Sequence, residues 1–260
     1  MHLVASVRPA ADLEAAVSAL VASAGMTRAE ARMRLAPEPP ALLARLPAGD
    51  AERVVAELRG AGLQALAVDE DVPSDRDRFL VRSFTLEPGT GRFVSRAGDS
   101  LAVPWDEVRL VLRGVRTSRT ATEHTETTRK IAPGRAVLTG GLVLTKKTTS
   151  TTRDVREDSE QFLLLHPAAG QRVLLGEDAL EFSGLGPLLQ PARTANLGVL
   201  AQQIGQRTPR AFHDDRLVRL GSRALPFIIG GGGERRSNTR VTVDVLAEVL
   251  DRAVRAGLLP

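Results

Sequence analysis

Short apolar runs and amphipathic stripes alternate along the first 70 residues of the chain. Residues 2–8 form an apolar run that predicts a strand. The apolar residues that follow recur at the spacing of one helix face, and they are Leu13, Val17, Leu20 and Val21. Pro9 suits the start of this helix and Gly25 suits its end.

A short helix and a strand are predicted next. Thr27 is placed to cap the helix, and Glu30, three residues later, completes the pattern of a capping box. Because a threonine hydroxyl can accept from a free amide of the first turn, the helix is expected to begin directly after Thr27. The apolar run at residues 40–47 then predicts the second strand of this region.

A third helix and a third strand complete the region. Residues 49–62 have helical periodicity, with Asp50 as the expected cap. The residues expected to face inward are Val54, Val55 and Leu58, and the glycines expected to end the helix are Gly60 and Gly62. The apolar run at 63–70 predicts a strand. The first 71 residues are therefore expected to form a small βααβαβ domain.

This region resembles a known family along "GMTRAEARMRLAPEPPALLARLPAGDAERVVAELRGAGLQALAV". It looks like the C-terminal domain of the ribosomal stalk protein, and the Clp protease adaptor is similar in fold. The features that carry the resemblance are Gly25, Ala29 to Ala31, Pro37, Asp50 to Glu52, Leu58 and Gly62. In both families the domain binds other proteins, so the resemblance implies a protein-binding role.

Beyond residue 71 the pattern changes to short strands. Residues 72–77 are polar and contain Pro73, and they are interpreted as a linker. A succession of strands separated by turn residues then leads to a helix at 191–207, and residues 78–208 are expected to form one antiparallel β-domain. The inward residues of that helix are predicted to be Leu197, Leu200, Ala201 and Ile204. Residues 209–260 are expected to form a loop and a helical tail.

The tail helix is predicted from a second apolar stripe, which consists of Val241, Val245, Val249 and Leu250. Strands followed by one closing helix, together with "VPWDEVRLVL", resemble a bacterial pleckstrin-homology-like domain. That resemblance implies a scaffold for lipid, peptide or protein. The expected fold class is α+β, with the small βααβαβ domain followed by the PH-like β-domain.

Composition narrows the classes of function. The chain has no cysteine, which excludes thiol catalysis, disulfides and thiolate metal sites. It has no apolar run long enough for a membrane helix and no signal-peptide pattern at its N-terminus, so a cytoplasmic location is expected. The basic residues are concentrated at 115–156, where nine basic residues accompany three acidic ones.

The basic segment is rich in threonine at residues 117–154, and four interpretations compete. Because threonine favours strands, two long β-arms are the leading one. Phosphorylation beside the basic residues, binding to phosphates of nucleic acid and contact with an anionic membrane surface are the others. The residues that could contact an anion are Arg116, Arg119, Arg129, Lys130, Lys146 and Lys147.

Short motifs with catalytic associations have simpler explanations. "GDSL" at residues 98–101 lies between two predicted strands, where Gly-Asp makes a turn. The run of four glycines at 230–233 lacks the spacing of a phosphate-binding loop. "HDD" at 213–215 could supply metal ligands, but a solvated loop is favoured because the histidines are scattered. No catalytic, cofactor-binding or metal-binding residue is therefore predicted.

The expected function is non-catalytic protein interaction, as an adaptor or scaffold whose partner the sequence does not identify. The alternative is a binder of an anionic partner, either a membrane surface or a nucleic acid, through the Thr-rich 115–156 segment. Salt separates the two, because binding through basic side chains weakens steeply as ionic strength rises.

Overall fold

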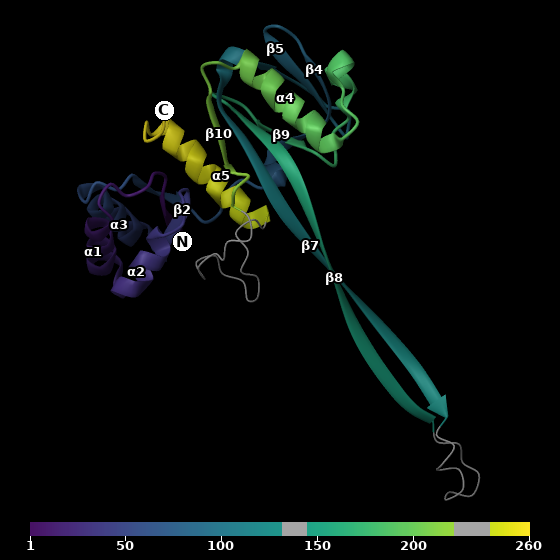
Figure 1. Ribbon diagram of the computed structural model, residues 1–260, viewed down its shortest axis with the longest axis horizontal. Helices are drawn as coiled ribbons and strands as arrows, with labels where there is room; N and C mark the ends of the chain where they lie inside the picture. The colour runs from purple at the N-terminus through teal and green to yellow at the C-terminus, as the bar shows by residue number, and fades with distance from the viewer. Residues whose placement is uncertain (132–144, 221–239) are drawn as a thin grey trace, which may run out of the picture. The chain divides into compact units, whose positions relative to one another are not determined.

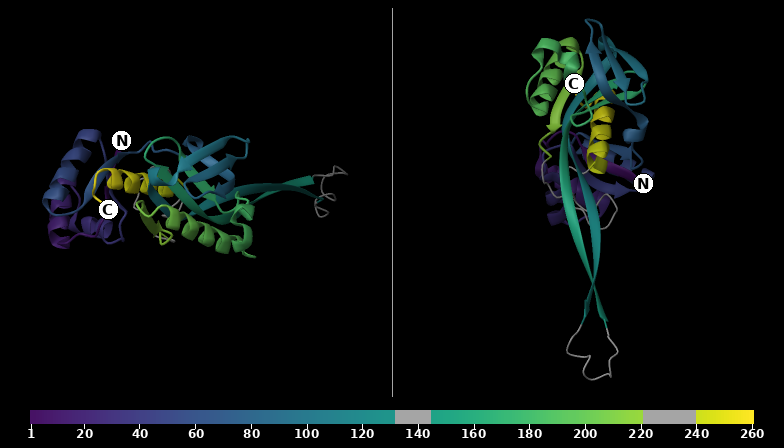
Figure 2. Two further views of the ribbon diagram at one scale, coloured as in Figure 1. Left: turned by 90° about the horizontal axis from the view of Figure 1, so that it is seen from above. Right: turned by 90° about the vertical axis from the view of Figure 1, so that its right-hand side faces the viewer.

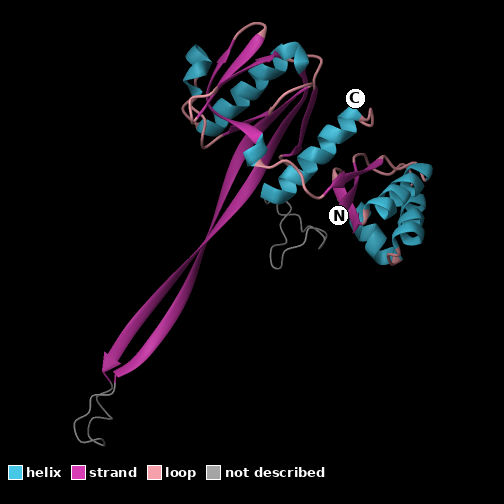
Figure 3. Cartoon of the chain, turned by 180° about the vertical axis from the view of Figure 1, so that it is seen from behind, coloured by secondary structure: helices cyan, strands magenta, loops and turns pink. Residues whose placement is uncertain are grey.

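A computed structural model describes residues 1–131, 145–220 and 240–260, with the backbone alone for residues 118–131 and 145–157. Helices and strands are mixed throughout, and the predicted α+β class is confirmed (Figure 3). The chain divides into two compact units. The first contains residues 1–116 and 160–260, and the second contains residues 117–159.

The predicted βααβαβ order of the N-terminal region is confirmed. Its strands are β1 (His2–Ser6), β2 (Ala41–Leu46) and β3 (Ala65–Asp69). They form an antiparallel sheet in the order β2-β1-β3, which leaves β2 and β3 at the edges. The helices are α1 (Leu13–Ala24), α2 (Arg28–Leu35) and α3 (Ala48–Gly60) (Figure 1). They pack on one face of the sheet around a local apolar core.

Two of the predicted helix starts are wrong, and one is confirmed. The first helix begins at Leu13 because the Asp12 carboxylate accepts from the amide of Ala15, and Leu13 itself is 45% exposed rather than inward. The Thr27 hydroxyl caps α2 as predicted. The third helix begins at Ala48, before Asp50, because the carbonyl of the preceding proline already accepts the first helical amide. Asp50 instead lies in the first turn, where a negative charge favours the helix dipole.

The second sheet has seven strands in the order β10-β7-β8-β9-β4-β5-β6. Its strands are β4 (Arg78–Leu86), β5 (Thr90–Ser95), β6 (Ser100–Pro104), β7 (Val108–Ile131), β8 (Thr145–Pro167), β9 (Arg172–Gly176) and β10 (Phe212–Leu217). Three short 3₁₀ segments lie beside these strands. The first, η1 (Asp75–Asp77), precedes β4, the second, η2 (Trp105–Glu107), joins β6 to β7, and the third, η3 (Phe182–Leu188), follows β9. The sheet is mostly antiparallel, although β9 runs parallel to β4 and β10 parallel to β7.

Helices cover both faces of the larger sheet because its central strands are apolar on both sides. In β8, Leu163 and Leu165 belong to the core of α4 (Arg193–Arg207), whereas Phe162 and Leu164 belong to the core of α5 (Arg240–Arg255). This alternation follows from the two-residue period of a strand. The predicted inward residues Leu197, Leu200 and Ile204 of α4 are fully buried.

The helix α5 is buried on almost all sides, with eleven of its sixteen residues inaccessible. It shares one apolar core with the larger sheet and with the face of the smaller sheet opposite α1–α3. The predicted stripe is correct for Val245, Val249 and Leu250, but Val241 is 58% exposed. A helix that contacts apolar surfaces on more than one side needs more than one stripe.

The domain boundaries predicted at residues 71, 77 and 208 do not coincide with the boundaries of the apolar cores. Leu3, Leu66 and Val68 of the smaller sheet are buried in the core that contains α5. Residues 213–215, expected in a solvated loop, lie within β10, which pairs with β7. Each of these segments has an apolar face that only a distant part of the chain covers, so their boundaries do not follow local composition.

The predicted turn at Gly98 is confirmed, with φ of 92° between β5 and β6. The prediction of long strands in the Thr-rich segment is also confirmed, since β7 continues to Ile131 and β8 begins at Thr145. Figure 2 shows these two strands side by side in both views. The glycine and proline signals at 133–134 and 140–141, like the glycines at 230–233, lie outside the described residues. Within the described ranges, no helix has the length and hydropathy needed to cross a membrane.

Candidate functional site

Of the six residues predicted to contact an anion, five lie on the backbone-only parts of β7 and β8. They are Arg119, Arg129, Lys130, Lys146 and Lys147, and their side chains are outside the described residues. The sixth, Arg116, is 8% exposed. Its Nε donates to Glu160 Oε2 at 3.0 Å and its Nη1 donates to both carboxylate oxygens of Asp75 at 2.9 Å.

Arg116 therefore joins parts of the protein rather than facing outward to an anion. Its guanidinium group also lies 5.9 Å from the ring centroid of Phe162. Burial opposes its charge, but Glu160 and Asp75 outweigh this effect and raise the pKa of Arg116. Sequence charge alone does not distinguish such a buried, paired arginine from a solvated one.

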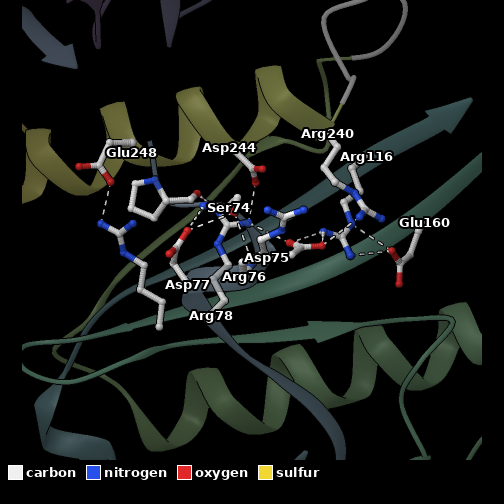
Figure 4. A network of polar contacts seen from close by, with 12 residues as sticks. Ser74, Asp75, Arg76, Asp77, Arg78, Arg116, Glu160, Arg240, Asp244 and Glu248 are labelled. Carbon is white, nitrogen blue, oxygen red and sulfur yellow. Dashed lines mark hydrogen bonds and ion pairs between the residues drawn. The ribbon is translucent and has the colours of Figure 1, made fainter. Parts of the chain in front are cut away.

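Asp75, which lies in the predicted linker, is the centre of an ion-pair cluster (Figure 4). Its carboxylate contacts Arg78, Arg116 and Arg240 at distances of 2.9 to 3.2 Å. Ser74 and Asp77 form a capping box that fixes the surrounding turn η1. Acidic residues that looked like solvated linker positions thus hold β4, β7 and α5 together.

Acidic residues on α5 continue this cluster along the helix. Asp244, Glu248 and Asp251 are spaced at four and three residues, which places them on one face of the helix. Arg78 contacts Asp244 at 2.5 Å, and Arg172 contacts Glu248 at 2.6 Å and Asp251 at 2.8 Å. The helix is therefore joined to β4 and β9 by buried pairs of opposite charge.

The pKa values of these carboxyl groups reflect a balance between burial and their arginine partners. Burial dominates at Asp244 and raises its pKa. At Glu248 and Asp251 burial has the same tendency, but neighbouring cations and hydrogen bonds outweigh it and lower the pKa of both groups. Asp251 has the most partners, since Arg109, Arg172 and Arg255 all contact its carboxylate.

His166 is buried beside the same carboxylate. Its side chain is 1% exposed, and Nδ1 lies 3.2 Å from Asp251 Oδ1 in a geometry that does not form a hydrogen bond. Neither ring nitrogen has a hydrogen-bond partner within the described part of the chain. Burial, together with the charges of Arg172 and Arg109, outweighs the attraction of Asp251 and lowers the pKa of His166.

A groove of about 600 Å³ lies beside the edge strand β3. One wall is a single stripe of α3, formed by Glu52, Val55, Ala56 and Arg59. Strand β3 contributes Leu66, Ala67 and Asp69, and β1 contributes His2. Arg252 in the last turn of α5 and Ala256 directly after that helix complete the lining. The groove is therefore lined by apolar and charged side chains together, a combination that is typical of a binding site.

Short-range structure holds several of the groove residues in place. Arg59 donates through Nε to the carbonyl of Ala65 at 2.8 Å. The Asp69 carboxylate accepts from the amide of Asp71 at 3.0 Å, and this bond lowers the pKa of Asp69. Arg252 donates through Nε to Glu248 at 2.8 Å, while its side chain stays 53% exposed. Charged side chains of both signs are thus present in the lining of the groove.

Sequence reasoning did not find this groove. The stripe of α3 is visible in the sequence, because Val55, Ala56 and Arg59 follow Glu52 by three, four and seven residues and therefore share one helix face. Arg252 and Ala256, however, lie almost 200 residues further along the chain, and nothing in the local pattern connects them to β3.

Comparison with known proteins adds no family: no protein-family model matches the chain, and no curated protein and no solved structure matches it at a significant level.

Proposed function

We propose that this protein is a non-catalytic adaptor or scaffold that binds another protein in the groove beside β3. The observation that carries the proposal is the groove itself, which has apolar and charged side chains in its lining and a volume of about 600 Å³. A site of this composition suits a segment of polypeptide, which offers apolar and charged side chains together.

The rigidity of the groove supports this proposal. Each wall belongs to an element that also contributes to a core, since Leu58 of α3, Val68 of β3 and Leu250 of α5 are fully buried. A site whose walls are already packed loses little conformational freedom when a partner binds. The resemblance of residues 1–71 to protein-binding domains is in line with this role.

The test is affinity capture from nuclease-treated native lysate, followed by mass spectrometry. The bait is the full-length protein, compared with an Ala56→Arg variant that places a long charged side chain in the groove. Ala22→Arg is the matched control, because Ala22 is an exposed helical alanine of α1 outside the groove. A defined protein captured by wild type and Ala22→Arg but lost with Ala56→Arg is the expected result. Identical capture by all three would refute the proposal.

A second candidate function is binding of an anionic partner by the 115–156 segment. Strands β7 and β8 are hydrogen-bonded neighbours, and Arg116 of one contacts Glu160 of the other. Residue 130 lies 14 positions beyond 116, and residue 146 lies 14 positions before 160. An unbroken register would therefore bring positions 129 and 130 opposite 147 and 146. Four basic residues would then fall close together along two neighbouring strands, and a local excess of positive charge favours an anionic partner.

This second function is tested by replacing both Lys146 and Lys147 with glutamate. Binding of the full-length protein to anionic vesicles and to nucleic acid should weaken at least tenfold, and it should also fall steeply as salt increases. A variant that binds both as well as wild type would show that the basic segment is not the contact. The Ala56→Arg variant should behave as wild type here, because its substitution lies on another element.

A further inference from the structure

We propose that the partner occupies the groove as an extended segment that adds a fourth strand to the free edge of β3. This inference rests on the proposed protein-binding function and specifies its mode and the chemistry of the partner. The partner segment carries an acidic side chain near Arg59, a basic side chain near Glu52 and Asp69, and small or apolar side chains between them.

The hydrogen bonds between β1 and β3 determine which backbone groups face the groove. Glu70 donates to the carbonyl of Met1, and Val7 donates to the carbonyl of Gln64. In an antiparallel pair, alternate residues use both backbone groups toward the neighbouring strand. Given the register of His2 with Asp69, the even-numbered residues of β3 bond to β1, and the backbone groups of Ala65, Ala67 and Asp69 point away from it.

Part of this outward edge is available to another strand. Arg59 already occupies the carbonyl of Ala65. Within the described ranges, the outward amide and carbonyl of Ala67 have no hydrogen-bond partner, and β3 has β1 as its one neighbour in the sheet. Ala67 also lines the groove. Unpaired backbone groups at a sheet edge are the feature that a strand from another chain uses when it extends the sheet.

The two walls match the alternation of side chains on an added strand. Ala65 and Ala67 pack toward α3, and Leu66 and Val68 pack toward α5, so the two helices lie on opposite faces of the sheet. Side chains of an added strand would point alternately to these two faces. On the α3 side they would meet Val55 and Ala56, and on the α5 side Arg252 and Ala256.

The charges at the two ends of the groove indicate which charged side chains the partner carries. Helix α3 is followed by β3 after a short turn, and Arg59 contacts Ala65, so the end of α3 lies at the start of β3. Glu52, seven residues earlier on the same stripe, lies toward Asp69. These ends are separated by about 10 Å along the helix and about 13 Å along the strand. A segment with an acidic and a basic side chain about four residues apart would complement both.

The test begins with peptides selected from a random dodecapeptide phage library against the full-length protein. One enriched peptide is synthesised, and its affinity is measured by isothermal titration for each variant. Ala67→Pro removes the outward amide without affecting a bond to β1. Its matched control is Ala102→Pro on the edge strand β6, where Ala102 likewise has its backbone groups turned away from the neighbouring strand.

Ala67→Pro is expected to weaken binding at least tenfold, as is Ala56→Arg, whereas Ala102→Pro and Ala22→Arg should bind as wild type. Hydrogen exchange of the backbone amides is a second measurement. It uses the wild-type protein, so it remains informative even if Ala67→Pro folds poorly. The amides of Ala67 and Asp69 should exchange rapidly in the free protein and slow on addition of the peptide, with no change in β6.

Three outcomes would overturn the addition of a strand from a different protein to this edge. The library could yield no binder, the amide exchange of Ala67 could be unaffected by the peptide, or sedimentation could show a wild-type dimer that Ala67→Pro converts to a monomer. The last result would assign the edge to a second copy of this chain. A lysate protein that is lost with Ala56→Arg but retained by Ala67→Pro would leave the adaptor function standing while rejecting this mode of binding.

Discussion

Polar groups around α5 and polar groups along β3 differ in how they are partnered. The carboxylate of Asp251 is completely buried and contacts three arginines, and Asp75 likewise contacts three. At β3, the outward amide and carbonyl of Ala67 have no partner within the described part of the chain, and they line a groove. The carboxylates around α5 are thus partnered by side chains of the protein itself. The backbone groups at the edge of β3 remain open to a partner from outside.

A high density of charged residues alone therefore does not mark a binding site. Removing a charge from water is costly, so buried carboxylates persist where guanidinium groups compensate them. An unpaired backbone group at a sheet edge can form its hydrogen bond with water, so leaving it unpaired costs little free energy. A strand from another chain can later take the place of that water. The buried cluster therefore maintains the arrangement of the elements, and the open edge is where a partner can be accommodated.

The largest effect on stability is expected when the N-terminal sheet is separated from α5. A fragment of residues 1–71 would expose Leu3, Leu66 and Val68, which are buried in the core shared with α5. Without that cover the fragment should show no cooperative urea transition and should bind a hydrophobic dye. A cooperative transition for the fragment would mean that the groove wall formed by α5 is dispensable for the fold.

The next largest effect concerns the buried cluster around α5. Asp251→Asn removes the charge that Arg109 and Arg172 share, and it should lower the free energy of unfolding by about 3–5 kcal/mol in urea titrations. Glu14→Ala, which removes an exposed carboxylate paired with Arg28 and Arg32, is the control and should hardly shift the urea midpoint. Equal effects for both variants would contradict the assigned role of the buried cluster.

A smaller effect should appear as a dependence of stability on pH. The pKa of buried His166 is lowered in the folded protein, so below the unfolded value of about 6.5 the unfolded chain binds a proton that the folded one does not. Stability should therefore be intact above about pH 6.5 and decrease as pH falls below it, by up to about 1.4 kcal/mol per pH unit.

His166→Gln tests the origin of this slope, because it keeps a polar side chain that does not titrate. Urea midpoints measured between pH 5 and pH 7 should depend less on pH in the variant than in wild type. A slope that is the same in both proteins would assign the dependence to other groups.

The smallest effect is expected at the groove beside β3. Ala56→Arg and Ala22→Arg both place a good helix former at an exposed helical position, so each should change the free energy of unfolding by less than about 0.5 kcal/mol. Thermal and urea unfolding would measure it. A clear loss of stability for Ala56→Arg alone would mean that the groove is part of the packing rather than an open site.

Local signals predicted much of the fold. Thr27 and Gly25 mark helix ends through a side-chain oxygen and a left-handed backbone, and both act within four residues. The stripe of α4 and the turn at Gly98 were also readable, because periodicity and turn geometry are local properties. The candidate site was not readable, since its walls come from α3, β3 and α5.

Sequence by itself determined the α+β class, the βααβαβ order and most of the strands, because apolar period and capping chemistry act between near neighbours. Only the tertiary contacts make Asp244 and Asp251 buried partners of arginines, and Asp75 a half-buried one, rather than solvated charges. Tertiary structure also decided that β3 is an edge with a groove beside it. The physical reason is that burial and strand pairing depend on which distant segment covers a residue, and the residue's own neighbours in the chain do not specify that segment.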